Sequence, residues 1–348
     1  MAGNWNIGLD IGGSGIRMAV RRSGIVYQQS ALAAFRPGKK EYVALGDEAR
    51  VLRGREPMGM KTGVPLEGGR VSIEALLDMW LGHLIKLAQE EGSGRPHVLL
   101  VGGPNAREAD LQAVRGAILR AGGVGMSVLE AEYAAALGAW MPEDAGKEDG
   151  AQADVMENEG TMVIDVGAFS AFSALMAGGR IVRRDALPYG MQGALDDLRA
   201  ALRTQYALAA GRNTVEEAFF ALAGIGEEKD ALPVEVSGLH LERQLPATVL
   251  LRAETVREAV CPYAEAVGKM AAATILHAPE ELAADIQARG VLLTGGGARI
   301  ALVKEAVERI AGVKCRVSAE PEAAAIRGTM RVMNAPNRFG ELPLEAGE

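Results

Sequence analysis

The segment Asn6–Val20 reads NIGLDIGGSGIRMAV. An apolar run ends in Asp10, a glycine-rich turn follows, and a second apolar run leaves the turn, which predicts a strand, a tight turn and a second strand. Glycines in such a turn let several backbone N–H groups point at one spot and let a ligand approach closely, which suits a phosphate. Because a carboxylate would repel a bare phosphate, Asp10 is predicted to hold a hydrated Mg²⁺.

The chain contains the same pattern a second time. Thr161–Leu175 reads TMVIDVGAFSAFSAL, with Asp165 matching Asp10 and Gly167 matching Gly12. Each copy continues through a further turn into another strand. The duplication predicts two similar α/β halves that face each other across a cleft, each with an aspartate directed at one metal-bound phosphate tail.

Composition limits the function classes. A chain of 348 residues that is 49% hydrophobic has enough core for two domains. Its net charge of −8 gives no support to nucleic-acid binding, which needs a basic surface. Two cysteines are too few for a disulfide framework or a metal cluster and indicate a reducing compartment. No signal peptide and no membrane-spanning apolar run is present, so we expect a cytoplasmic protein.

Alternating strand and helix patterns follow the first hairpin and predict a mostly parallel core sheet. We expect a first domain over residues 1–140, with a small subdomain at 31–70 and a completing segment at 316–335. The acidic, aperiodic residues 141–160 predict a solvated loop. A second domain follows at 161–315, with a small subdomain at about 190–255. In it a helix is predicted at Thr214–Leu222, where Thr214 and Glu217 have capping-box spacing. Residues 336–348 are expected to form a tail.

A third glycine-rich turn lies near the end of the second half. Gly290–Ala298 reads GVLLTGGGA, a buried strand that runs into three glycines opening a helix. Backbone of this kind can lie flat against a planar ligand or a phosphate, with a helix N-terminus beside it.

With these features the chain resembles the MreB family of bacterial actins, within the actin, sugar kinase and heat-shock chaperone superfamily. The matching segments run collinearly from about residue 6 to 333. They are ALGDEAR at 44–50, LRGR at 52–55, residues 108–122 and 134–138, LPAT at 245–248, ETVREA at 254–259, PEELAADI at 279–286, RGVLLTGGGA at 289–298 and AEP at 319–321. The resemblance implies an α/β, actin-like fold: two duplicated RNase H-like domains around a nucleotide cleft, each with a small inserted subdomain.

The resemblance also implies a function and a set of site residues. The expected function is head-to-tail self-association into cytoskeletal filaments that organise cell shape and the cell wall, with cell-wall or division proteins as further partners. ATP and Mg²⁺ would lie in the cleft, with Mg²⁺ bound through water by Asp10 and Asp165, and with Glu217 near the ribose or the adenine. The implied ATP-binding residues are Asp10, Gly12, Gly13, Ser14, Gly15, Asp165, Gly167, Ser170, Glu217, Gly295, Gly296, Gly297 and Ala298.

Several positions depart from the family pattern. Glu130-Ala131-Glu132 replaces Glu-Glu-Pro, so that Ala131 stands where a glutamate positions the attacking water. In the second turn Phe169 adds bulk where the family has glycine, and Ser170 replaces threonine. Phe219 stands where the family has a lysine near the base, and Tyr189–Gly193 replaces a Gly-Gly-Asp turn. Because phosphoryl transfer depends on positioning, we expect at most a slow ATPase with weakened nucleotide binding. Glu130 or Glu132 taking over as the catalytic carboxylate is the open alternative.

Two other functions and the membrane question stay open. A small-molecule, sugar-type kinase would need a base just after the strand ending near Val101, where residues 102–107 contain no acid before Glu108. A nucleotide-independent adaptor would use the same fold only as a docking surface. The family binds membranes through an apolar loop or an amphipathic helix. Here the one candidate anchor is Trp5, so we expect weak direct membrane binding, with peripheral attachment at the inner face of the cell membrane left open.

Overall fold

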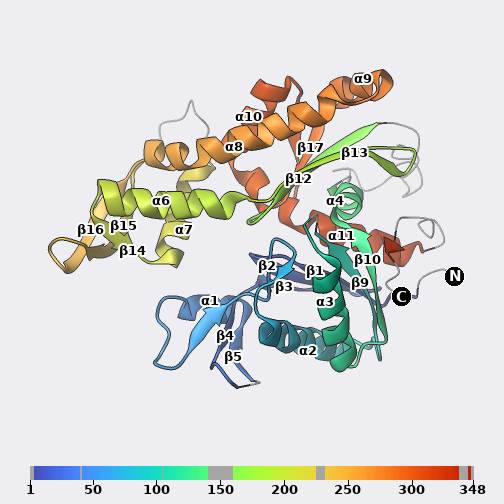
Figure 1. Ribbon diagram of the computed structural model, residues 1–348, viewed down its shortest axis with the longest axis horizontal. Helices are drawn as coiled ribbons and strands as arrows, with labels where there is room; N and C mark the ends of the chain where they lie inside the picture. Colours follow the sequence, from blue (N-terminus) through green and yellow to red (C-terminus); the bar gives the residue numbers. More distant parts are fainter. Residues whose placement is uncertain are drawn as a thin grey trace.

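The computed structural model describes residues 4–39, 41–103, 105–139, 160–224, 232–336 and 344–345. Two sheets, each covered by helices, form the centres of two halves that face each other (Figure 1). The acidic loop predicted at 141–160 lies outside the described residues, apart from Gly160. Among the helices of the described ranges, none combines the length and the apolar character needed to span a membrane.

The first sheet contains the first predicted hairpin. Its strand order is β19-β10-β9-β1-β2-β3, with β1, β2 and β3 antiparallel and β9 and β10 parallel to β1. Helices α2 (Glu74–Glu90) and α3 (Glu108–Arg120) pack against this sheet through a shared apolar core. The strands are β1 (Ile7–Ile11), β2 (Gly15–Val20), β3 (Gly24–Ser30), β9 (His97–Gly102), β10 (Gly125–Glu130) and β19 (Leu344–Glu345).

The second sheet contains the second predicted hairpin in the same arrangement. Its order is β13-β12-β11-β17-β18, with β17 parallel to β11 and β18 parallel to β17. Helices α8 (Ala253–Leu276), α9 (Glu280–Arg289) and α10 (Ala301–Ala311) belong to this half (Figure 1). The strands are β11 (Thr161–Val166), β12 (Ala171–Ala177), β13 (Arg180–Leu187), β17 (Val291–Thr294) and β18 (Cys315–Val317).

The C-terminal segments differ in detail from the expectation. The first residues of the segment predicted at 316–335 belong to β18 in the second sheet, whereas α11 (Ala324–Asn334) packs on β1, β2 and β9 of the first. The segment predicted as a tail contains β19, which pairs antiparallel with β10 at the edge of the first sheet. Trp5, the candidate membrane anchor, is only 3% exposed and lies in the apolar core shared by both halves.

Each half carries a smaller subdomain beside the cleft. In the first half it contains a three-stranded sheet, a short hairpin and helix α1 (Gly46–Leu52). In the second half it contains α6 (Met191–Gln205), α7 (Arg212–Ala223) and a three-stranded sheet. The strands are β4 (Ala33–Phe35), β5 (Tyr42–Leu45), β6 (Lys61–Gly63), β7 (Leu66–Glu67), β8 (Arg70–Val71), β14 (Leu208–Ala210), β15 (Val234–His240) and β16 (Leu245–Leu251).

Helix α7 begins earlier than the capping-box spacing predicts. Gly211 is the N-cap residue, Arg212 is the first helical residue, and the N–H of Val215 already donates to the Gly211 carbonyl over 3.0 Å. Thr214 therefore lies inside the helix, and the predicted start is wrong. The short strand β14 ends at Ala210, and the extended backbone of Gly211 leads directly into the helix.

Helices α4 (Ala131–Ala139) and α11 cross at very close range between the halves. An added Cβ at Gly138 would lie 1.7 Å from the Ala324 carbonyl oxygen, and one at Gly328 would lie 2.0 Å from that of Ala134. Only glycine permits this approach, because any side chain would overlap backbone. Since α4 also packs on β11 and β17, the crossing joins the first sheet to the second.

Candidate functional site

A cavity of about 360 Å³ lies between the two halves. Both predicted hairpin turns contribute to its wall, together with the triple glycine and the helices α6 and α7 of the second subdomain. The predicted residues that line it are Asp10, Gly12, Gly13, Ser14, Gly15, Asp165, Gly167, Ser170, Gly295, Gly296 and Gly297. The structure therefore brings together most of the residues that the sequence singled out. Ala298 is not among the described lining residues and is 3% exposed.

The two turns have the same backbone geometry. The N–H of Gly12 donates to the Gly15 carbonyl over 3.0 Å, and the N–H of Gly167 donates to the Ser170 carbonyl over 2.9 Å. Each turn closes an antiparallel hairpin, between β1 and β2 in one half and between β11 and β12 in the other. Equivalent turns place Asp10 and Asp165 in the wall of one cavity from opposite sides.

The triple glycine is shaped by its contact with β11. Gly295 has a positive φ of 78°, and an added Cβ there would lie 2.5 Å from the Val166 carbonyl oxygen. An added Cβ at Gly297 would lie 2.4 Å from Val166 Cγ1, whereas one at Gly296 would meet no atom within 4 Å. Gly295 and Gly297 are therefore needed for packing. Gly296 leaves its backbone accessible in the cavity wall.

The pKa of Asp165 is raised to about 6, mainly by burial and in smaller part by the nearby Asp10 charge. Thr294 opposes this change, because its buried Oγ1 donates to Asp165 Oδ2 over 2.8 Å. The parallel pairing of β11 with β17 sets Asp165 directly beside Thr294. An aspartate in this environment gains stability when a cation compensates its charge.

Arg17 provides one such cation on the first hairpin. It is the cross-strand partner of Asp10, and its Nη1 lies 3.4 Å from Asp10 Oδ2. Burial raises the pKa of Asp10, and the charge of Arg17 opposes the change. The motif-based prediction did not include Arg17. A signal for it exists in the sequence, because a four-residue chain reversal after Asp10 places residue 17 opposite it and on the same face of the sheet.

The donor set of the cavity fits a hydrated metal ion bound together with a ligand. Among the described residues, no group of three or more His, Cys, Asp or Glu could hold a metal. Asp10 and Asp165 offer two carboxylates in one cavity, and Mg²⁺ is commonly held by one or two carboxylates plus water and phosphate oxygens. The residues present therefore suit Mg²⁺ that arrives with a phosphate tail, and not a metal held by protein ligands alone.

The sequence matches the family model of the MreB/Mbl protein over residues 4–341. The chain belongs to the MreB/Mbl family. It is 27% identical to the cell shape-determining protein Mbl of Bacillus cereus (strain ATCC 10987 / NRS 248) over 296 residues, covering 84% of this chain and 85% of that protein. It is 24% identical to the cell shape-determining protein MreB of Escherichia coli K12 over 341 residues, covering 96% and 95%.

Solved structures of the same kind show the fold. The structure of MreB5 of Spiroplasma citri bound to ADP superposes with a TM-score of 0.85 at 21% identity, covering 96% of this chain and 98% of that one. The MamK double helical filament gives a TM-score of 0.71 at 18% identity, covering 94% and 97%. The predicted actin-like fold is thus confirmed for this MreB/Mbl protein.

In this MreB/Mbl chain the side chains of the two candidate catalytic glutamates, Glu130 and Glu132, do not share the environment of the Ala131 side chain between them. Ala131 lines the cavity between the halves, which we call the main cavity. Glu130 and Glu132 line an adjoining cavity together with Arg184, and the two cavities share lining residues such as Gly102. Arg184 Nη1 lies 3.1 Å from Glu130 Oε1 and 3.9 Å from Glu132 Oε1. Burial raises the pKa of Glu132, and the Arg184 charge opposes the change. Neither carboxylate stands in the wall of the main cavity where Ala131 does.

The helix α7 of this MreB/Mbl protein presents Glu216 to the cavity, while Glu217, the predicted residue, is not among the described lining residues. Phe219, one turn from Val215, is fully buried in the core of the second half, and Phe220 lines the cavity instead. Arg299 and Glu322 were also missed; they line the cavity and form a bidentate pair with distances of 3.0 and 2.8 Å.

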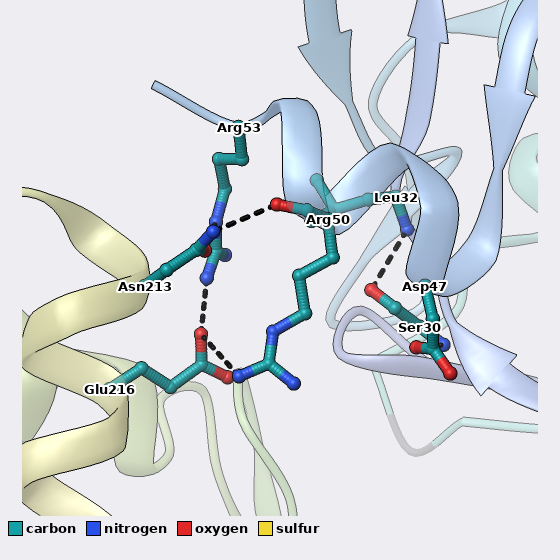
Figure 2. A network of polar contacts seen from close by, with 7 residues as sticks. All are labelled: Ser30, Leu32, Asp47, Arg50, Arg53, Asn213 and Glu216. Atoms are coloured by element: carbon teal, nitrogen blue, oxygen red, sulfur yellow. Dashed lines mark hydrogen bonds and ion pairs between the residues drawn. The ribbon is translucent and has the colours of Figure 1, made fainter. Parts of the chain in front are cut away.

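Glu216 also joins the two subdomains across the cleft. Figure 2 shows Arg50 and Arg53 of the α1 segment directed at Asn213 and Glu216 of α7. Arg53 pairs with Glu216 and donates through Nε to Asn213 Oδ1 over 2.7 Å, while Arg50 Nη2 lies 3.7 Å from Glu216. Asn213 Nδ2 donates back to the Arg50 carbonyl over 2.8 Å. We call these four residues the subdomain latch.

Asp110 of α3 is an acid that lines the cavity and follows the strand that ends near Val101. It accepts hydrogen bonds from the Val71 N–H over 2.9 Å and from Arg107 over 2.7 and 3.1 Å. These bonds from Arg107 and Val71 lower the pKa of Asp110 to about 2. A carboxylate so well compensated is a poor base for a substrate hydroxyl. The geometry therefore disfavours a sugar-type kinase.

Proposed function

We propose that this MreB/Mbl protein is a cytoskeletal actin homologue that assembles into filaments for cell-shape or cell-wall organisation. It binds an adenine nucleotide between its halves and hydrolyses it slowly or not at all. The observation that carries the proposal is the cavity in which two equivalent hairpin turns, each with its aspartate, face the triple glycine. Backbone N–H groups from two such turns suit a phosphate tail, and the accessible backbone at Gly296 suits the nucleoside.

The relatives and structural neighbours support this proposal. The matched Mbl and MreB relatives are named cell shape-determining proteins. MreB5 of Spiroplasma citri has been solved with ADP and with AMPPNP, and MamK as a double helical filament. By the same likeness we infer head-to-tail self-association, which needs an interface that does not close into a ring. Cell-wall or division proteins are proposed as further partners, and the inner face of the cell membrane as a place of peripheral attachment.

Mg²⁺ is proposed to bind with the nucleotide. Asp10 and Asp165 would hold the ion through water, and it would screen the charge of the phosphate tail. Arg17, 3.4 Å from Asp10, supplies a fixed positive charge on the same wall. We expect binding to be less dependent on Mg²⁺ than it would be with the two aspartates alone.

Weak hydrolysis follows from the catalytic position. Ala131 lines the cavity with a methyl group, which cannot orient an attacking water. Glu130 and Glu132 are engaged by Arg184 in the neighbouring cavity. Phosphoryl transfer loses most of its acceleration when the water is not positioned.

Electron microscopy with a parallel phosphate-release assay tests the proposal. Negatively stained protein is compared without nucleotide, with ATP and with AMPPNP. Filaments with little phosphate release are the expected result. The absence of polymer in every condition would overturn the filament proposal and favour the adaptor function, and rapid phosphate release would show that the interpretation of Ala131 is wrong.

A further inference from the structure

The aromatic ring of Phe169 lies directly against the backbone of Gly13 on the opposite turn. An added Cβ at Gly13 would lie 2.3 Å from Phe169 Cδ2 and 2.4 Å from Cε2. The ring therefore occupies the position next to Gly13 that a side chain or a ligand atom would otherwise take. Gly13 and Phe169 both line the main cavity, one from each half.

The Phe169 residue also touches the short hairpin of the first subdomain. An added Cβ at Gly68, between β7 and β8, would lie 3.5 Å from the Phe169 carbonyl oxygen and 3.6 Å from its Cβ. Phe169 thus packs its ring against the first turn, while its backbone and Cβ lie beside the hairpin. A partly buried ring packed against backbone has limited room to swing away.

The backbone that carries Phe169 is held in place by helix α6. The N–H of Met191 donates to the Gly167 carbonyl over 3.1 Å, and the N–H of Gln192 donates to the Ala168 carbonyl over 2.8 Å. An added Cβ at Gly190 would lie 2.3 Å from the Gly167 carbonyl oxygen. Because the turn is packed and hydrogen-bonded from behind, it cannot retreat easily to make room for a ligand beside Phe169.

The position of the ring determines how long a phosphate tail the cavity accepts. With the nucleoside bound near Gly296, as proposed above, and near Phe220, the tail would extend toward the two turns, and its last group would reach the gap between them. Gly296, Phe220 and both turns line the same cavity. The Phe169 ring fills this gap next to Gly13 and offers no hydrogen-bond donor. A terminal phosphate there would exchange part of its hydration for contact with an apolar ring, which is costly for a charged group.

We propose that Phe169 is a specificity-determining residue that makes the cavity select nucleoside diphosphates over nucleoside triphosphates. This inference rests on the proposed nucleotide binding at the same site. The ring excludes the terminal phosphate by its volume and its apolar character. The inner phosphates can still bind the backbone of the first turn and Arg17.

Isothermal titration calorimetry with Mg²⁺·ADP and Mg²⁺·AMPPNP tests this inference on the full chain. For the unmodified protein we expect ADP to bind at least about tenfold more tightly than AMPPNP, a difference of about 1.4 kcal/mol. In Phe169→Gly the ratio should fall to about threefold or less, through tighter AMPPNP binding with ADP affinity nearly constant. Phe169→Leu, which keeps an apolar side chain in the gap, should retain most of the selectivity, and the melting temperature of each variant shows that it is folded.

The outcomes separate this inference from the proposed function. Equal affinity of the unmodified protein for both nucleotides, or a parallel change for both in Phe169→Gly, would overturn the role of Phe169 and leave nucleotide binding intact. Failure of every folded variant to bind either nucleotide would overturn the proposed nucleotide binding and the inference with it.

Discussion

Arg184 on β13 reaches across the boundary between the halves and pairs with Glu130 at the end of β10, with 3.1 Å between Nη1 and Oε1. The same guanidinium lies 3.9 Å from Glu132. Both glutamates beside Ala131 are therefore used to join the halves, and the wall of the main cavity keeps only a methyl group at this point. In the Glu-Ala-Glu triplet, the two glutamates thus hold the halves together and the central alanine alone lines the main cavity.

Restoring a carboxylate at the cavity wall should restore hydrolysis only when the terminal phosphate has room. We expect Ala131→Glu alone to leave phosphate release from ATP low, whereas Ala131→Glu with Phe169→Gly should raise it by on the order of tenfold or more. Phosphate release at saturating ATP measures the effect. The control is Ala131→Gln with Phe169→Gly, which has the same size but no base. Equal rates for the Glu and Gln double variants would contradict the assigned role of this position.

The subdomain latch in Figure 2 predicts different behaviour for two adjacent glutamates. Glu216→Ala removes the partner of Arg50 and Arg53 and should raise amide hydrogen exchange in α1 and α7 about fivefold, as for the loss of about 1 kcal/mol. The effect should shrink at high salt, which weakens the latch in the unmodified protein. Glu217→Ala is the matched control, because Glu217 takes part in none of the described latch contacts. Similar exchange in both variants would refute the latch.

The raised pKa of Asp165 predicts that the free energy of unfolding depends on pH. Its pKa is about 6 in the folded protein, against an ordinary value of 3.8 for a solvated aspartate, so the folded state binds more protons between these values. The free energy of unfolding therefore falls as the pH rises from about 4 to 6 and stays lower above it. Asp165→Asn should be more stable at pH 7.5 by up to about 3 kcal/mol.

Urea unfolding at two pH values checks this expectation. Between pH 5 and pH 7.5 the stability advantage of Asp165→Asn should widen by on the order of 1 kcal/mol. Thr294 can still donate to the amide oxygen of the asparagine, so the variant should keep the local hydrogen bond. Parallel pH profiles of the two proteins would show that Asp165 is not strained by burial.

Because α4 and α11 cross so closely, we expect a single added methyl group at the crossing to reduce the stability of the protein strongly. Gly328→Ala places Cβ 2.0 Å from the Ala134 carbonyl oxygen, so the helices must separate, at a cost of about 3 kcal/mol or more. Gly82→Ala in α2 is the matched control, because its Cβ meets no atom within 4 Å and should stabilise the helix by up to about 1 kcal/mol. Thermal unfolding distinguishes the two. A melting temperature of Gly328→Ala near that of the unmodified protein would contradict the close crossing.

The duplicated hairpins could be predicted because their information is local. An apolar run that ends in Asp10 or Asp165 before a glycine turn specifies strand, turn and strand without knowledge of the rest of the chain. The triple glycine at 295–297 was found in the same way. Together these segments placed most of the cavity wall correctly.

The remaining features depend on contacts between distant segments. Glu217 is implied by the resemblance alone, and only the packing of α7 in the second half shows that Glu216, one residue earlier, lines the cavity. The contact of Phe169 with Gly13 exists only once the two halves are assembled. The pairing of β19 with β10 likewise brings together residues far apart in the chain. The sequence shows that Phe169 is larger than the glycine typical of the family, but it does not show that the ring packs against Gly13.

The two halves are joined where the backbones of α4 and α11 touch. With no side chain between Gly138 and the backbone of Ala324, the helices cannot approach each other more closely than they do. The latch helices α1 and α7 lie well away from this contact, toward the left of Figure 1. A rotation of the two halves about this contact would displace Arg53 and Glu216 more than residues beside Gly138. Distance probes on α1 and α7 would therefore report opening of the cleft more sensitively than probes near α4.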